Sequence, residues 1–166
     1  MGSPCSLQYN GTDIAGWPVT FTNAVKTGQV KVCKTIPLTS QNALGGKTFS
    51  YSVYIQQPGA PGYAGPFQLG PIFPGECTSF LGPIPVLQPN GTKTAVGIHE
   101  NEVTGTQNFT VTNIALTSGT RGYCTTSNSS TIVCSYATGF SYADGNVNFF
   151  VGPGDNVITY TNTANG

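Results

Sequence analysis

Charged residues are scarce in this sequence of 166 residues. Asp, Glu, Lys and Arg make up 7 % of it, and six basic residues balance six acidic ones, so the formal net charge is zero. Domains that bind nucleic acid or anionic membranes need a concentration of Lys and Arg. We therefore expect no nucleic-acid partner. The polarity comes instead from Thr, Ser, Asn and Gly, which favour strands and turns.

The sequence is also poor in the residues that build metal and catalytic sites. It holds one histidine, His99, and no Cys-x-x-Cys pair, so a zinc site is not expected. The nucleophile-elbow, zinc-protease and phosphate-loop motifs are absent from the sequence, and we expect neither an enzyme nor a cofactor. No apolar run approaches the ~20 residues of a membrane-spanning helix.

Helical periodicity is nearly absent, and alternation of apolar and polar residues dominates. Clusters of Gly, Pro and Asn separate the alternating runs, as in sandwiches and barrels. We predict an all-β fold, an antiparallel Ig-like or transthyretin-like β-sandwich. The expected strands are Val19–Asn23, Gln29–Thr35, Thr48–Gln56, Glu76–Leu81, Lys93–Glu100, Gln107–Leu116, Thr131–Tyr136, Asn146–Val151 and Asn156–Thr163.

The two ends of the chain repeat one pattern. Val19–Ala24 reads VTFTNA, and Ile158–Thr163 reads ITYTNT. Two Thr-rich strands can share such a pattern by chance. Alternatively, residues 1–28 form an N-terminal extension before a domain of residues 29–166. The extension would then be the end of a preceding repeat, a strand donated to a neighbouring copy, or an added strand of its own sheet.

Five cysteines favour an oxidising, extracellular compartment, although the odd number leaves one without a partner within the chain. Cys124 and Cys134 flank the polar turn Thr125–Ser130, so a disulfide across a hairpin is expected there. We predict a secreted or cell-surface protein.

From Gly28 onward the sequence resembles the prealbumin-like (Cna B-type) modules of bacterial surface adhesins and pilins, in particular a cysteine-containing variety. The segments that resemble the family occur in the family's order, and the last of them is the strand whose pattern Val19–Ala24 repeats. They are Gly28–Lys34, Phe49–Val53, Phe73–Cys77, Gly82–Val86, Gly91–Glu100 and Ile158–Thr163. It implies a structural or adhesive module, a strut of a stalk, pilus or fibre. The stretch Thr117–Gly145 goes beyond the family core and is expected to be an elaborated loop region.

The resemblance also implies a bond between a first-strand lysine and a last-strand asparagine, assisted by a central glutamate. Lys34, Glu100 and Asn162 occupy these places. Each continues the apolar face of its strand, and such residues are costly to bury unless they meet one another. They could form the bond, meet without bonding, or end their strands in water. Glu102 has the same parity as Glu100 and is the reserve acid.

The resemblance further implies a disulfide between Cys33 and Cys77, which leaves Cys5 free or paired with another molecule. A rival pairing joins Cys5 to Cys33 or Cys77.

A carbohydrate- or protein-binding module is the second hypothesis. Its stacking surfaces would come from Trp17, Tyr63, Phe67 and Tyr142, with Tyr54 and Phe140 as further candidates. The segment Pro58–Phe73 is expected to be a long recognition or contact loop. The expected partners are copies of the chain arranged head to tail, and a host or matrix glycan or protein.

Overall fold

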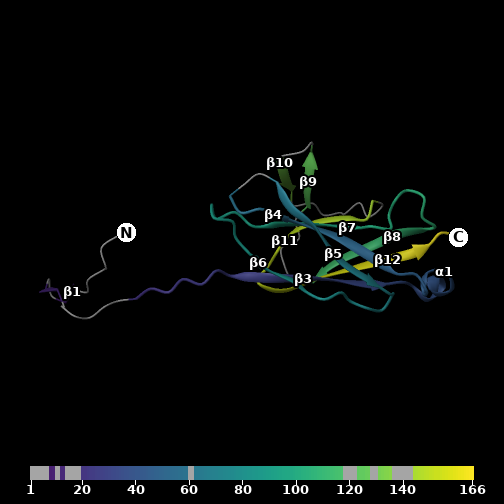
Figure 1. Ribbon diagram of the computed structural model, residues 1–166, viewed down its shortest axis with the longest axis horizontal. Helices are drawn as coiled ribbons and strands as arrows, with labels where there is room; N and C mark the ends of the chain where they lie inside the picture. Colours follow the sequence, from purple (N-terminus) through teal and green to yellow (C-terminus); the bar gives the residue numbers. More distant parts are fainter. Residues whose placement is uncertain are drawn as a thin grey trace.

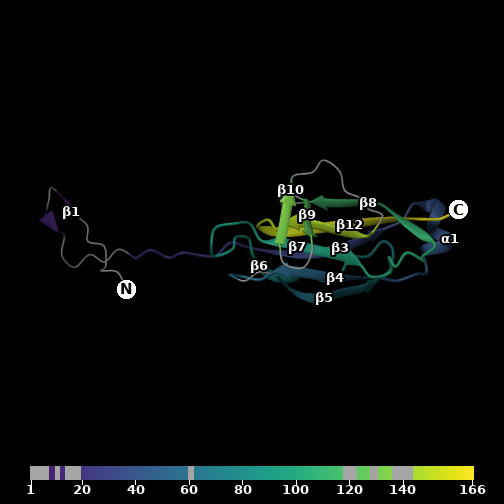
Figure 2. The same cartoon turned by 90° about the horizontal axis from the view of Figure 1, so that it is seen from above.

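The computed structural model describes residues 8–9, 12–13, 20–59, 62–117, 123–127, 131–135 and 144–166. Two four-stranded sheets form a β-sandwich, which confirms the predicted fold class. One sheet has the order β6-β3-β12-β8, formed by Leu81–Pro85, Thr27–Thr35, Gly154–Ala164 and Phe109–Thr117. The other has the order β11-β7-β4-β5, formed by Asn146–Phe150, Ala95–Glu100, Phe49–Gln56 and Tyr63–Ile72. Figures 1 and 2 show the sandwich from two sides.

The core lies between the sheets because alternate residues of their strands are apolar. In β3 the burial alternates strictly, and Val30 and Val32 are fully buried. Ile158 and Tyr160 are likewise fully buried in β12, and the buried residues Tyr51 and Val53 face them from β4. The apolar residues that alternate with polar ones in the sequence of these strands are therefore the residues that form the core.

One neighbouring pair of strands is parallel. β3 and β12 run in the same direction, with Gly28 opposite Gly154 and Lys34 opposite Tyr160. The other pairs within the two large sheets are antiparallel. The parallel pairing places the first strand of the sandwich beside the last, from Gly28 to Thr35 of β3 and from Gly154 to Thr161 of β12.

Two predicted strands are wrong among the described residues. Residues 20–26 form no strand, and Phe21 is 75 % exposed. The segment Glu76–Leu81 is mostly not a strand either; within it Cys77 forms an isolated bridge with Cys33, and β6 begins only at Leu81.

The predicted loop Pro58–Phe73 is also wrong, because most of it is the edge strand β5. Pro66 and Pro71 suggested a loop, but proline is compatible with an edge strand, where one row of amides needs no partner. A short helical segment, η1 (Leu38–Ser40) with α1 (Gln41–Leu44), was likewise missed.

Four short strands, in two antiparallel pairs, complete the described chain. β1 (Gln8–Tyr9) pairs with β2 (Thr12–Asp13). Within the predicted elaborated region, β9 (Tyr123–Ser127) pairs with β10 (Thr131–Ser135). Both views show residues 20–26 leading away from one end of the sandwich, while α1 and the C-terminus lie at the other end (Figures 1 and 2).

Candidate functional site

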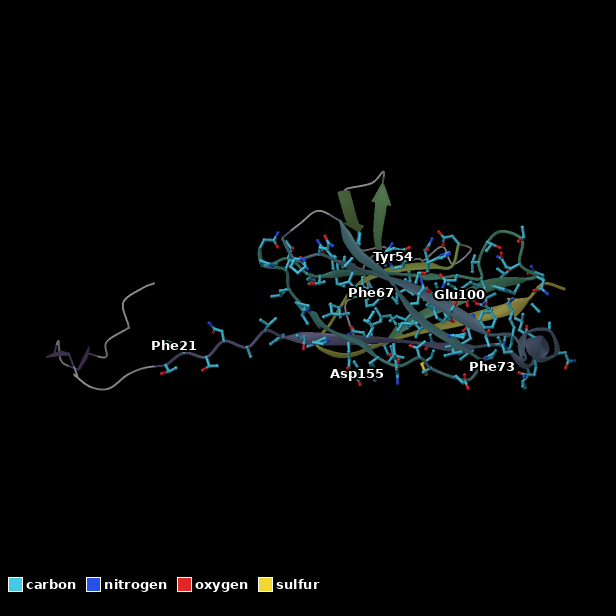
Figure 3. All side chains as sticks on the ribbon, viewed as in Figure 1. Phe21, Tyr54, Phe67, Phe73, Glu100 and Asp155 are labelled. Atoms are coloured by element: carbon cyan, nitrogen blue, oxygen red, sulfur yellow. A yellow bond between two sulfur atoms is a disulfide. The ribbon has the colours of Figure 1, made fainter. Side chains whose placement is uncertain are left out.

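Lys34, Glu100 and Asn162 meet inside the sandwich. Lys34 lies on β3 and Asn162 on the neighbouring β12, while Glu100 is the last residue of β7 in the facing sheet. Tyr160 is the register partner of Lys34, so Asn162 follows two residues later on the same inward face. All three side chains are fully buried. Figure 3 shows Glu100 within the sandwich.

Glu100 is the centre of the cluster because it contacts both other members. Lys34 Nζ donates to Glu100 Oε1 at 2.5 Å, and this is a fully buried ion pair. Asn162 Nδ2 donates to both carboxylate oxygens, at 3.2 Å to Oε1 and 3.0 Å to Oε2. The Asn162 Oδ1 atom is buried without a hydrogen-bond partner. One carboxylate oxygen thus joins an amine to the nitrogen of a carboxamide.

Aromatic rings form the surroundings of the cluster. Lys34 Nζ lies 4.0 Å from the ring centroid of Phe49 and 5.9 Å from that of Tyr160. Tyr51 donates its hydroxyl hydrogen to Glu100 Oε1 at 3.3 Å. Sequence reasoning did not assign these three rings to the site. Their position on buried faces of β4 and β12 could have indicated them.

Burial controls the charge of the cluster. It lowers the pKa of Lys34 from 10.5 to about 8, although the charge of Glu100 and its hydrogen bond act in the opposite direction. Burial raises the pKa of Tyr51 and of Tyr160, and the negative charge of Glu100 adds to both effects. Burial therefore favours the neutral forms of Lys34, Tyr51 and Tyr160.

Comparisons with known proteins concern the fold. No family model matches the sequence, and no curated protein matches it. The major pilin of Streptococcus pyogenes is similar in structure, with a TM-score of 0.51 and 13 % identity over 96 % of this chain and 54 % of the pilin. A point variant of that pilin gives 0.52 at 12 % identity, covering 95 % of this chain and 54 % of the pilin. This chain shares its fold with part of a bacterial pilin.

A second solved protein is similar at lower score. The pilus-presented adhesin Spy0125 (Cpa) has a TM-score of 0.47 and 12 % identity, over 84 % of this chain and 28 % of the adhesin. The chain thus spans about half of the pilin and just over a quarter of the adhesin.

Glu102, the reserve acid, contacts Ser50 instead of Lys34 or Asn162. Its carboxylate accepts from the Ser50 amide at 3.1 and 3.0 Å and from the Ser50 hydroxyl at 3.0 Å. It therefore closes the turn after β7 onto β4, whereas Glu100 holds the contacts to Lys34 and Asn162.

Cys33 and Cys77 form a disulfide, the pairing that the family resemblance implies. The register of β9 and β10 sets Cys124 opposite Cys134, as expected for a bridged hairpin, but their side chains lie outside the described residues. Cys5 also lies outside them, so its state stays a prediction.

The structure describes some of the predicted ligand-binding aromatic residues but not others. Tyr63 and Phe67 both lie on the edge strand β5, and Phe67 is 39 % exposed. Tyr54, on β4, is 38 % exposed; Figure 3 labels it with Phe67. Trp17, Phe140 and Tyr142 lie outside the described residues.

His99 lies on β7, an inner strand of the second sheet, where its Nδ1 and Asn146 Oδ1 are 2.8 Å apart. Within the part of the chain that the structure describes, no group of three or more His, Cys, Asp or Glu residues is arranged to hold a metal ion. Over those same residues, no helix has the length and apolar character to cross a membrane.

Proposed function

We propose that this chain is a structural module of an extracellular bacterial fibre or stalk that locks its own fold by an amide bond from Lys34 Nζ to Asn162 Cγ. The observation that carries the proposal is the fully buried contact of lysine, glutamate and asparagine between the first and last strands of the sandwich. A buried ion pair is a poor source of stability, because desolvation offsets its attraction. Conversion to a neutral amide removes that penalty.

The contacts of Glu100 support the proton transfers that the reaction needs. A proton passes from the Lys34 ammonium to Glu100 Oε1, which leaves a neutral amine and a neutral acid. The Nζ lone pair attacks Asn162 Cγ, the Nζ–Cγ bond forms and the Cγ–Nδ2 bond breaks. Glu100 gives its proton to Nδ2 and accepts one from Nζ, and ammonia leaves. Glu100 is placed for both transfers because Lys34 Nζ and Asn162 Nδ2 both contact its Oε1.

The surroundings favour the reactive, neutral form of the Lys34 amine. The Lys34 pKa of about 8 reflects an amine whose charged form is destabilised by burial. The rings of Phe49, Tyr51 and Tyr160 enclose the pair in apolar surface. The same enclosure keeps out water, which would otherwise compete with the amine for the carboxamide.

Three further observations support an extracellular fibre. The pilin-like fold is one that builds such structures, although at 13 % identity the likeness concerns fold alone. A structural disulfide is typical of proteins in an oxidising compartment. The low charge also agrees with a protein that needs no electrostatic steering to a substrate.

Copies of the chain are proposed to associate head to tail. At the end of the sandwich where the N-terminal segment leaves, Val25, Pro85, Leu87 and Pro89 line an apolar hollow of about 690 Å³. At the opposite end, beside α1, Leu38 is 92 % exposed. An exposed apolar side chain at one end and an apolar hollow at the other are complementary features of a heterologous contact, which propagates into a fibre when its rotation does not close.

Intact mass spectrometry tests the bond directly. Reduced and denatured wild-type protein should weigh less than its sequence by one ammonia, and Glu100→Ala should restore the full mass. Glu102→Ala is the matched control, because it removes a nearby carboxylate that contacts neither Lys34 nor Asn162, and its mass should stay reduced. A wild-type mass equal to that of the sequence would refute the bond.

Ligand binding is the second candidate function. It is favoured by the partial exposure of Tyr54 and Phe67, since exposed aromatic rings stack on sugars and peptides. A glycan array with the wild type and Phe67→Ala tests it. Binding that the substitution abolishes would support an adhesive role.

A further inference from the structure

The edge of β3 at Lys34 is covered by a short segment, Glu76–Thr78. β6 pairs with β3 only from Thr27 to Val30. Beyond that point the Lys34 amide donates to the Glu76 carbonyl at 3.0 Å, and the Thr78 amide donates to the Val32 carbonyl at 2.8 Å. The segment thus continues the sheet where β6 has ended.

Two more hydrogen bonds close the same edge. The Gly75 amide donates to the Lys34 carbonyl at 2.8 Å, and the Val32 amide donates to Thr78 Oγ1 at 3.1 Å. Both main-chain groups of Lys34 are therefore satisfied by Gly75 and Glu76 rather than by water.

The Cys33–Cys77 disulfide lies at the centre of these four bonds. Cys33 stands between Val32 and Lys34, and Cys77 stands between Glu76 and Thr78. The segment has little apolar anchoring of its own: Phe73 before it is 47 % exposed and Phe80 after it is 39 % exposed, while Thr78 is buried. A covalent link is what such a lightly packed edge needs to stay closed.

We propose that the Cys33–Cys77 disulfide positions Lys34 for bond formation, by holding Glu76–Thr78 on the edge of β3 and so keeping water from the Lys34–Glu100 pair. The inference rests on the proposed amide bond. Cys33 and Cys77 are positioning residues, because neither contacts the reacting atoms.

The physical link between disulfide and reaction is the solvation of the pair. Water admitted beside Lys34 stabilises the ammonium and the carboxylate and disfavours their neutral forms. The closed edge supports the burial that lowers the pKa of Lys34 to about 8. The other titratable groups facing it are Glu100 on β7, Tyr51 on β4 and Tyr160 on β12, with Glu102 further off. These remain when the disulfide is removed.

The first test follows ammonia loss with time during refolding, by intact mass. The variant carrying Cys33→Ser and Cys77→Ser, and wild type refolded with a dithiol reductant, should react more slowly than oxidised wild type by roughly tenfold or more, the effect of raising the amine pKa by one unit. The matched control carries Cys124→Ser and Cys134→Ser and should react at the wild-type rate under oxidising conditions. Equal rates in all proteins would overturn the positioning role and leave the amide bond standing.

The pH profile separates positioning from general destabilisation. In wild type the rate should fall above about pH 8, where the pair loses the proton that the leaving ammonia needs. Without the disulfide the plateau rate should be lower, and the fall should move to higher pH, because the pKa of Lys34 returns toward 10.5. A lower rate with an unmoved profile would show a merely structural disulfide and refute the proposal.

Hydrogen exchange gives a readout that does not need the bond. In Asn162→Ala, which cannot react, reduction should speed exchange at the amides of Lys34, Gly75 and Thr78 but not at Ile98 in β7. If reduction leaves the exchange rates of these amides unchanged, the inference is overturned even if wild type loses ammonia. Absence of ammonia loss from oxidised wild type would overturn the amide bond itself, and the inference with it.

Discussion

Asn162→Ala should cost the protein much more stability than any contact of this side chain can supply. The proposed bond closes a loop of about 130 residues between Lys34 and Asn162. By the loop-closure estimate used for disulfides, a crosslink over that length stabilises by about 5 kcal/mol. For a domain of this size each kcal/mol changes the melting temperature by roughly 2–4 °C. The expected fall is therefore about 10–20 °C.

A double-mutant cycle isolates the covalent part of this loss. Lys34→Met, Asn162→Ala and the double variant should each lose about the same free energy of unfolding, because either single change already removes the bond. The coupling between the two sites should then be about 5 kcal/mol, the value of the crosslink. Guanidinium unfolding at equilibrium, with mass spectrometry of each sample, provides the four values.

Side chains that merely touch give a smaller coupling. Contacting residues in one buried network are coupled by about 0.5–3 kcal/mol. Thr161→Ala, a change next to Asn162 on the other face of β12, should leave both the loss of ammonia and the coupling unaffected. A coupling below about 3 kcal/mol would refute the covalent bond, and the cluster would then be a buried ion pair.

Two further predictions concern charge and assembly. In unbonded Asn162→Ala, the pKa of Lys34 is about 8 in the folded state and 10.5 in the unfolded state, so the unfolded state binds more protons between these values and stability should rise with pH. Chemical unfolding at pH 8 and 9.5 should show a gain of about 2 kcal/mol, absent from bonded wild type; above pH 10 the raised pKa values of Tyr51 and Tyr160 act the other way. For assembly, removal of residues 1–24 should leave a folded monomer in sedimentation, and so should Leu38→Asp. The control Thr39→Asp should associate like wild type. A wild type that is already monomeric would contradict the head-to-tail proposal.

Strand parity explains why the candidate site could be predicted from the sequence. Lys34, Glu100 and Asn162 each continue a run of alternate apolar residues, and side chains of one parity share one face. A sandwich has only one interior, so three polar side chains on inward faces must share it. Parity alone does not give depth along the strand. That came from the register of β3 with β12, which places Lys34 opposite Tyr160 and thus near Asn162.

The elements that sequence reasoning missed are those where alternation fails. β5 contains Gly65, Pro66, Gly70 and Pro71, which resemble loop residues, and its register with β4 shifts twice. Alternation also fails within β8, which was predicted as a strand: its buried positions change from odd to even numbers after Val111, because the pairing with β12 is irregular at that point. Bulges of this kind reset the side-chain period locally.

The position of the triad also determines which part of the module would bear tension in a fibre. The chain enters the sandwich at the start of β3 and leaves it at the end of β12, and these strands are parallel neighbours. A bond from Lys34 to Asn162 joins them near their C-terminal ends. Force would pass along β3, cross the bond and leave through Ala164, so residues 35–161 would carry none of it. The disulfide from Cys33 to Cys77 lies just before the crossing point. The two links would therefore stabilise the same corner of the fold, the one that a load reaches last before leaving the module.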